Sequence, residues 1–460
     1  MDEIPPTMED IRGRVLFPDD AGYEPEISGY QTGFVQKPRA VVAAAEKNDI
    51  AAAVRLGGEW DVPVGVQATG HGLAAGCAGG VLVTTSRLRG VRVDAGRRTA
   101  WLDAGARWAD VIEAAAGFGL APLSGSAPGV GAVGYTLEGG TGLLARRYGY
   151  AADLVTSADL VMADGRSRRV TADSDPDLFW AIRGAGANFG IVTGLEIGLV
   201  ELDRMYGGGL YFAEDLVPEV LRAWLEWTAG VPDGMTSSIG LIPYPDRPTV
   251  PEPVRGRYVA HVRIAYAGGA AEGDRLVAPL RAVGPRLMDS LGELPYTKSD
   301  TIYRDPEAPM AYYATNVLTG SLDAAAAETV LALAGPGSGL PCVVQISHLG
   351  GALAAEPAVP SVVGHRDARY ALRVLSRLDP GGGAEQAPAL RPRHERVYTA
   401  LGDRVLGRSL NFMLGGFVTA DDVWSGYDPD DRERLAELKR RHDPRNLFRC
   451  YHNIPAKAPS

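Results

Sequence analysis

The sequence has few cysteines, no long apolar segment and no concentration of positive charge. Its three cysteines, Cys77, Cys342 and Cys450, lack a metal-binding spacing, and an odd number cannot all pair. We therefore expect no metal site, reduced thiols and a cytoplasmic protein. No apolar run reaches the roughly 18 residues that a membrane span needs. The first residues, MDEIPP, are acidic and not apolar, so we expect neither membrane association nor a signal peptide.

The charge balance argues against nucleic acid as a partner. The net charge is −10 at pH 7, and no stripe of basic and aromatic residues opposes it. The one basic run, Lys439-Arg440-Arg441, is expected on the solvated last turn of a helix, where positive charge is favourable. With 46% hydrophobic and 22% charged residues, the chain has an ordinary globular composition. Its richness in Ala, Gly and Arg suggests a bacterial origin.

The first part of the chain alternates short apolar runs with helical periodicity. Residues 40–44 and 63–68 predict buried strands, and Asn48 or Asp49 begins a helix that continues to about Trp60. Further along, Asp164-Gly165 is a two-residue hairpin signal between two strands. The two buried strands and the helix between them predict a β-α-β unit that is followed by a glycine loop.

The middle of the chain predicts an antiparallel sheet with helices on one face. Alternation predicts strands at residues 210–213, 237–242, 257–266, 314–319 and 343–348. Helical periodicity predicts helices at residues 218–228, 271–283, 324–333 and 365–378. Residues 381–388 are the best candidate for a disordered loop, and residues 411–418 predict a strand.

A histidine flanked by glycines follows the second buried strand, in the segment ATGHGL at residues 68–73. Glycines let the backbone turn sharply and approach a ligand closely, and successive N–H groups of such a loop suit a diphosphate. His71 is therefore a candidate attachment point for a bound group. The alternative is a structural histidine held by hydrogen bonds.

A second loop, residues 125–135, consists almost entirely of small residues. Small residues let a backbone lie against a planar cofactor, and Gly139, Gly140 and Gly142 extend that surface. A flexible loop is the alternative, but the interleaved Val130 and Val133 indicate packing.

Together these motifs resemble the berberine-bridge-enzyme-like branch of the FAD-linked oxidases, within the vanillyl-alcohol-oxidase/PCMH-type flavoproteins. The likeness includes GYTLEGGTGLLARRYGYAAD at residues 134–153, DLFWAIRGAGANFGIV at 177–192, His365-Arg366-Asp367, and the ending at residues 434–454. It implies an α+β fold with two domains. Residues 1–203 plus 409–460 would form the PCMH-type FAD-binding domain, and residues 204–408 an inserted substrate domain, an antiparallel sheet covered by helices.

The resemblance implies an FAD held covalently by an 8α-histidyl bond to His71. Some relatives add a bond through a cysteine, but Ala127 stands at the matching position, so we predict attachment through His71 only. The residues expected to contact the flavin are Val66, Gln67, Ala68, Thr69, Gly70, His71, Gly72, Ala127, Pro128, Val130, Gly131, Gly134, Tyr135, Gly139, Gly140, Gly142, Tyr148, Gly149, Ala152, Asp153, Gly190, Ile191, Val192, Asn411, Tyr451 and Asn453.

Three residues are predicted to take part in catalysis. Tyr135 replaces a histidine that relatives often place near flavin N1, and it can donate a hydrogen bond without carrying positive charge. Strand alternation puts Gln345 and Ser347 on one face, towards the flavin, and His348 on the other. Plant relatives use a glutamate base on this sheet, which an amide cannot replace; the alternative is that both residues only line the sheet surface. Asn411 matches a position beside the ring. Weaker cavity candidates are Tyr303, Tyr313 and Asn316.

The resemblance implies an FAD-dependent oxidase. An alcohol, amine or natural-product intermediate, in bacterial secondary metabolism, would give a hydride to flavin N5, and O₂ would reoxidise the flavin. The expected partners are therefore a small-molecule substrate and O₂, with the protein a monomer or homodimer. One alternative is an oxygenating or rearranging enzyme that acts on a polyketide-like intermediate. Another is a flavin-carrying scaffold without redox turnover.

Overall fold

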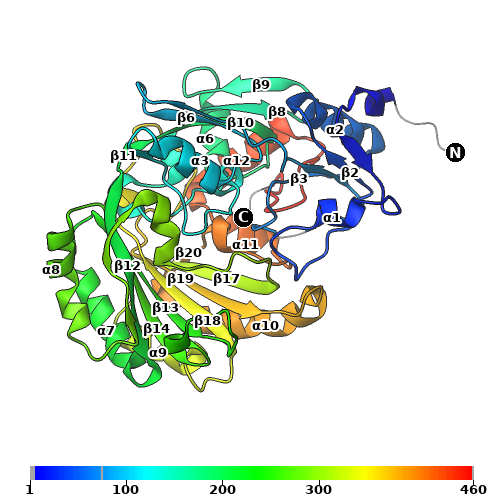
Figure 1. Cartoon of the computed structure of the whole chain (residues 1–460). Helices are drawn as coiled ribbons and strands as arrows, with labels where there is room; N and C mark the ends of the chain where they lie inside the picture. Colours follow the sequence, from blue (N-terminus) through cyan, green and yellow to red (C-terminus); the bar gives the residue numbers. More distant parts are fainter. Residues whose placement is uncertain (1–5, 74–75, 458–460) are drawn as a thin grey trace.

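Four β-sheets form the framework of the part of the chain that the computed structural model describes, residues 6–73 and 76–457 (Figure 1). Three smaller sheets come from the first 201 residues, and one nine-stranded sheet comes from residues 204–407. No helix within the described ranges is long and apolar enough to cross a membrane. Residues 1–5, which contribute to the expectation that there is no signal peptide, lie outside the described residues.

The first sheet positions the histidine loop. Its strand order is β1 (Arg14–Leu16), β2 (Ala40–Ala43), β4 (Val81–Thr84) and β3 (Val64–Gln67), and β2, β4 and β3 are parallel. The predicted helix between β2 and β3 is confirmed as α2 (Lys47–Trp60), which begins at a capping box of Glu46 and Asp49. Parallel β2 and β3, joined through α2, leave the loop that carries His71 directly after β3.

The second sheet is antiparallel, and its strands contribute many buried residues to the hydrophobic core of this part of the chain. Its strands, in spatial order, are β5 (Val91–Asp94), β6 (Thr99–Asp103), β10 (Ile191–Gly198), β8 (Val155–Val161) and β9 (Ser167–Val170). The predicted hairpin is confirmed between β8 and β9, where Gly165 has φ +76°. Helices α3 (Trp108–Ala116) and α6 (Pro176–Ile182) pack Trp108 and Phe179 into this core.

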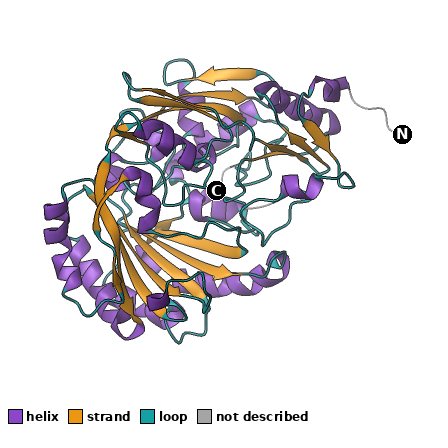
Figure 2. Cartoon of the chain, viewed as in Figure 1, coloured by secondary structure: helices purple, strands orange, loops and turns teal. Residues whose placement is uncertain are grey.

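The large sheet has an open face and a helix-covered face (Figure 2). Its strands are β12 (Arg204–Ala213), β13 (Met235–Pro243), β14 (Tyr258–Tyr266), β15 (Met288–Asp289), β16 (Gly292–Pro295), β17 (Tyr312–Thr319), β18 (Cys342–His348), β19 (Tyr370–Arg377) and β20 (Val405–Gly407). The covering helices are α7 (Val217–Thr228), α8 (Ala270–Arg281), α9 (Ala324–Ala334) and α10 (Gly383–Thr399). The antiparallel sheet covered by helices is thus confirmed, while the division into domains at residues 203/204 and 408/409 stays a prediction.

Three local predictions are wrong. The segment at residues 365–378, expected to be a helix, contains strand β19, because Leu372 and Val374 enter the core while the chain pairs with β17 and β18. Residues 381–388 are not disordered: α10 begins at Gly383 and buries Ala387. The expected strand at residues 411–418 is instead a short 3₁₀ helix, Leu410–Phe412, and a loop. In each case packing between distant segments overrode the local pattern.

The expectation of three reduced thiols is also wrong. Cys77 and Cys450, which are 373 residues apart in sequence, form a disulfide, and Cys342 is a free, buried thiol. Gly65 in β3 leaves the room for this bond, since a Cβ there would lie 3.0 Å from both Cys77 Sγ and Cys450 Cβ. An odd number of cysteines still allows one pair, and Cys77 and Cys450 form it because the fold brings them together.

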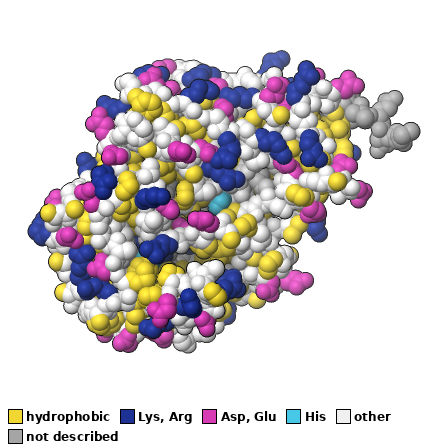
Figure 3. Space-filling view, viewed as in Figure 1, with side chains coloured by type: hydrophobic (Ala, Val, Ile, Leu, Met, Phe, Trp, Pro, Cys, Tyr) yellow, Lys and Arg dark blue, Asp and Glu magenta, His cyan; other side chains and the backbone are white. Residues whose placement is uncertain are grey.

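The basic run at residues 439–441 lies in the last turn of α12 (Pro429–His442), as expected. Lys439, however, is fully buried and pairs with Asp443, whereas the neighbouring Arg441 is exposed and pairs with Glu437. On the face shown in Figure 3, basic and acidic side chains are interspersed.

Candidate functional site

The loop after β3 presents free backbone donors. Gly70 has φ +68°, and a Cβ there would lie 2.7 Å from Gly29 Cα, so this position requires glycine. Within the described residues, the N–H groups of Gly70, His71 and Gly72 have no hydrogen-bond acceptor. Three successive free donors fit the anionic diphosphate of FAD.

The imidazole of His71 is held in a fixed orientation. Its ring stacks on Tyr30, with centroids 3.9 Å apart and an interplanar angle of 11°. His71 Nδ1 lies 2.9 Å from Thr69 Oγ1, and the His71 carbonyl accepts a hydrogen bond from Tyr312. Burial, assisted by the positive charge of Arg107, lowers the pKa of His71 to about 4. A neutral imidazole is a competent nucleophile, so the ring suits covalent attachment.

The second small-residue loop packs against the first. The N–H of Gly131 donates to Thr69 Oγ1 at 3.2 Å, and a Cβ on Gly131 would lie 3.3 Å from Ala68 Cβ. A Cβ on Gly129 would contact the edge of the His71 ring at 3.9 Å. The structure therefore brings together the two loops that the sequence marked as cofactor-binding, including Ala127 and Pro128 at the start of the turn.

Tyr135 lies on α4 (Ala132–Leu137), at the base of the glycine surface. Its ring meets Trp108 edge to face at 5.4 Å, and burial raises its pKa well above 10. Its hydroxyl is buried and has no hydrogen-bond partner among the described residues. Cβ atoms on Gly140 and Gly142 would lie 2.6 and 2.9 Å from Tyr135 atoms. Gly140 and Gly142 thus make room for the Tyr135 ring, and its unpaired hydroxyl is a donor that an acceptor atom of a bound group would satisfy.

Asn411 acts on this surface through the backbone. Its Oδ1 accepts from the N–H of Gly140 at 2.8 Å, and its Nδ2 donates to the carbonyl of Tyr135 at 3.0 Å. Both the oxygen and the nitrogen of the Asn411 side-chain amide therefore hold the backbone of residues 135–140. The predicted place of Asn411 beside the flavin ring stays a prediction.

Other predicted flavin contacts are dispersed around these loops. Asp153 forms an ion pair with Arg366 at 2.6 Å, and the Gln67 side chain donates a hydrogen bond to the carbonyl of Ile27. Asn453 Oδ1 is buried and lacks a partner among the described residues, as a cofactor contact would. The remaining ones stay predicted flavin contacts; they pack against the core or against close neighbours in this structure: Val66, Tyr148, Gly149, Ala152, Gly190, Ile191, Val192 and Tyr451.

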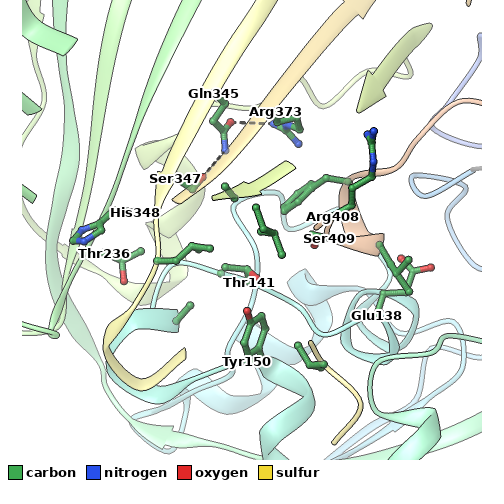
Figure 4. A pocket seen from close by; sticks show the side chains of 18 of the residues that line it. Glu138, Thr141, Tyr150, Thr236, Gln345, Ser347, His348, Arg373, Arg408 and Ser409 are labelled. Atoms are coloured by element: carbon green, nitrogen blue, oxygen red, sulfur yellow. Dashed lines mark hydrogen bonds between the residues drawn. The ribbon is translucent and has the colours of Figure 1, made fainter. Parts of the chain in front are cut away.

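A cavity separates the second glycine loop and its extension, at Ser126, Thr141 and Gly142, from the face of the large sheet that the helices leave uncovered (Figure 4). Thr141 and Tyr150 line it from one side, and Gln345 and Ser347 of β18 line it from the other. The predicted facing of Gln345 and Ser347 towards a cavity is borne out by this geometry. His348 reaches the cavity edge, where burial and the charge of Arg146 lower its pKa to about 3.

The weaker candidates divide between the two faces of the sheet. Tyr303 lines the cavity and accepts a hydrogen bond from Ser238. The side chain of Asn316 exchanges hydrogen bonds with the backbone of Ser409, and Tyr313 packs under α10 on the helix-covered face.

Sequence reasoning missed four side chains near this site: Tyr30, Arg263, Asp305 and Arg373. Arg263 could have been found from the sequence, because it is a charged residue inside the largely apolar strand VAHVRIAY. Arg373 was hidden by the wrong helix prediction, because only strand alternation turns it towards the cavity. Nothing local distinguishes Tyr30 or Asp305, which meet the site through tertiary contacts with His71 and Ser126.

Comparisons with known proteins agree with this arrangement. Residues 38–171 match a family model described as an FAD binding domain, and residues 427–455 match one described as berberine and berberine like. The chain is 29% identical over 468 residues to (R)-6-hydroxynicotine oxidase of Paenarthrobacter nicotinovorans, covering 96% of this chain and 97% of that protein. It is 25% identical over 453 residues to chitooligosaccharide oxidase of Gibberella zeae, covering 92% and 88%.

A solved structure extends the likeness to the fold. The crystal structure of 6-hydroxy-D-nicotine oxidase from Arthrobacter nicotinovorans matches with a TM-score of 0.82 and 28% identity, covering 97% of this chain and 98% of that one. The matched segments include both glycine loops and the C-terminal ending from which the resemblance was inferred. Over nearly its whole length the chain is thus similar to the berberine-bridge-enzyme-like FAD-linked oxidases.

Proposed function

We propose that the protein is an oxidase that carries FAD covalently on His71 alone and removes a hydride from a small-molecule alcohol, amine or natural-product intermediate. The observation that carries the proposal is the imidazole of His71, oriented by Tyr30 and Thr69 where two glycine-rich loops meet. When bound, the flavin supplies hydride acceptance at N5 and reoxidation by O₂, which yields hydrogen peroxide. Ala127, at the position of the second attachment in some relatives, supports a single bond.

The chain's own residues would orient the ring and tune its charge. The free N–H groups of residues 70–72 would bind the diphosphate. The unpaired hydroxyl of Tyr135, neutral at physiological pH, would donate a hydrogen bond to an acceptor atom of the ring. Asn411 would keep the 135–140 backbone in place. The substrate would enter the cavity between the second glycine loop and Gln345.

An absorbance spectrum followed by acid precipitation tests the proposal on wild type, His71→Ala and the control His442→Ala. His442 lies at the end of α12, outside both loops. Yellow colour should stay with the wild-type and His442→Ala pellets and leave the His71→Ala pellet. Colour released from all three proteins would contradict covalent attachment, and colourless wild-type protein would contradict FAD binding. Bleaching under nitrogen, followed by peroxide release in air, then identifies substrates.

A second candidate, oxygen transfer to a polyketide-like substrate, is favoured by one observation. On β18 the side chains that line the cavity are Gln345, Ser347 and, at its edge, His348, and neither Gln345 nor Ser347 can act as a base at neutral pH. Labelled oxygen in the product would support this function, and label in released peroxide alone would oppose it. A bound flavin that no candidate substrate bleaches would instead favour a scaffold without redox turnover.

The proposal also includes the finer assignments made from the sequence. Residues 1–203 plus 409–460 would bind FAD and residues 204–408 the substrate, in a monomer or homodimer serving bacterial secondary metabolism. Because disulfides are rare in the cytosol, the Cys77–Cys450 bond opposes the cytoplasmic location. Alkylation of free thiols at cell lysis tests that location.

A further inference from the structure

Two arginines from different strands converge on one amide in the cavity wall. Arg263 of β14 donates from Nη1 to Gln345 Oε1 at 3.3 Å, and Arg373 of β19 donates from Nη2 to the same oxygen at 3.0 Å. Figure 4 shows Arg373 beside Gln345 at the cavity. Strand register explains the meeting, since Gln345 pairs directly with Arg373 and, through Gly240 of β13, lies in one row with His261.

The backbone is shaped to admit Arg263. A Cβ on Gly240 would lie between 2.8 and 3.0 Å from three atoms of the Arg263 guanidinium. The guanidinium stacks on Tyr303, with Cζ 4.5 Å from the ring centroid, and its Nε donates to His261 Nδ1 at 3.2 Å. Arg263 is only 5% exposed. Glycine, aromatic ring and imidazole together keep a buried cation pointed along the open face of the sheet.

No carboxylate of the described residues is bonded directly to either of the two cations. Within the described residues, neither guanidinium lies within 4 Å of a carboxylate, and Gln345 supplies a neutral acceptor. Burial lowers the pKa of Arg373, and the nearby charge of Arg263 lowers it further. Buried charges are normally paired, and the buried Arg263 and the partly buried Arg373 lack the directly bonded anion that such groups usually have.

Asp305 connects the arginine pair to the flavin side of the cavity. Its carboxylate accepts a hydrogen bond from Ser126 in the second glycine loop at 2.5 Å. Its negative charge raises the pKa of both His71 and Arg373, so these groups share one electrostatic neighbourhood. One carboxylate offsets one of two cations, which leaves a net positive charge beside Gln345.

We propose that Arg263 and Arg373 form an oxyanion subsite, and that the substrate carries a carboxylate or an equivalent ionised oxygen. Arginine forks match the planar geometry of a carboxylate and hydrogen-bond it strongly. The subsite would anchor the anionic end of the substrate on the sheet and leave its oxidisable end towards the glycine loops. The statement that the bound anion is a substrate rests on the proposed oxidase function. Anion binding by Arg263 and Arg373 does not depend on that function.

Benzoate and its neutral analogue benzamide test the subsite in the purified holoprotein. Binding is measured by the change in flavin absorbance and, independently of the flavin, by calorimetry. Wild type should bind benzoate at least about tenfold more tightly than benzamide, because the charged hydrogen bonds are lost with the amide. Arg263→Gln and Arg373→Gln should each weaken benzoate binding by about tenfold or more. Arg377→Gln, an exposed position on the same strand, should not.

A further variant keeps the test decisive if the arginine variants fail to fold. Gln345→Glu places a carboxylate between the two guanidinium groups, so it should fold and should lose benzoate binding. Equal affinity of wild type for benzoate and benzamide, or unchanged benzoate binding in Gln345→Glu, overturns the proposal. So does a lower flavin reduction potential in Gln345→Glu with unchanged benzoate affinity, since the pair would then serve the ring. Colourless protein that binds benzoate in the calorimeter would refute the oxidase function and leave the subsite supported.

Discussion

Replacing Lys439 by methionine should destabilise the protein far more than the same change two residues later. Lys439 and Asp443 have fully buried side chains, with Nζ 2.7 Å from Oδ2. Nζ also donates to the carbonyls of Asn188 at 2.9 Å and Phe448 at 3.0 Å. Lys439→Met removes all three bonds and leaves the Asp443 carboxylate buried without its cation. Breaking a buried pair in this way costs about 3–5 kcal/mol.

Arg441 provides the matched control on the same helix. Its pair with Glu437 is more than half exposed on both sides, so Arg441→Met should cost less than about 1 kcal/mol. Urea unfolding, followed by flavin absorbance and fluorescence, measures both variants. Lys439→Met combined with Asp443→Asn should recover part of the loss, because the buried charge is gone. A loss below about 1 kcal/mol for Lys439→Met alone would refute the argument from burial.

Two other predictions concern the disulfide and the reactive histidine. Unreduced, denatured protein should show one titratable thiol, Cys342, and three after reduction, while Cys77→Ser should lower the free energy of unfolding by about 2–4 kcal/mol. Three thiols without reductant would disprove the cross-link. Because its pKa is lowered to about 4, His71 stays neutral as pH falls through 6.5, the ordinary histidine value. Covalent FAD uptake by apoprotein should therefore be flat from about pH 8 to about pH 5; a rate that halves near pH 6.5 would show an ordinary imidazole.

Local patterns were sufficient for the cofactor loops and most regular elements. Glycine and small residues around His71 and along residues 125–142 predicted surfaces that approach a ligand, and these surfaces do meet. Alternation correctly turned Gln345 and Ser347 to the cavity. These features depend on backbone freedom and on side-chain periodicity, both of which are written in short stretches of sequence.

The partners of these residues were decided only by the tertiary structure. Arg263 and Arg373 meet across β13 and β18 because of sheet order and register, which no local window contains. Cys77 reaches Cys450 across 373 residues for the same reason. Strand β19 itself exists because two neighbouring strands pair with it, against its helical apolar spacing. Periodicity determines on which face of a strand or helix a side chain lies, and long-range packing determines which residues it contacts there.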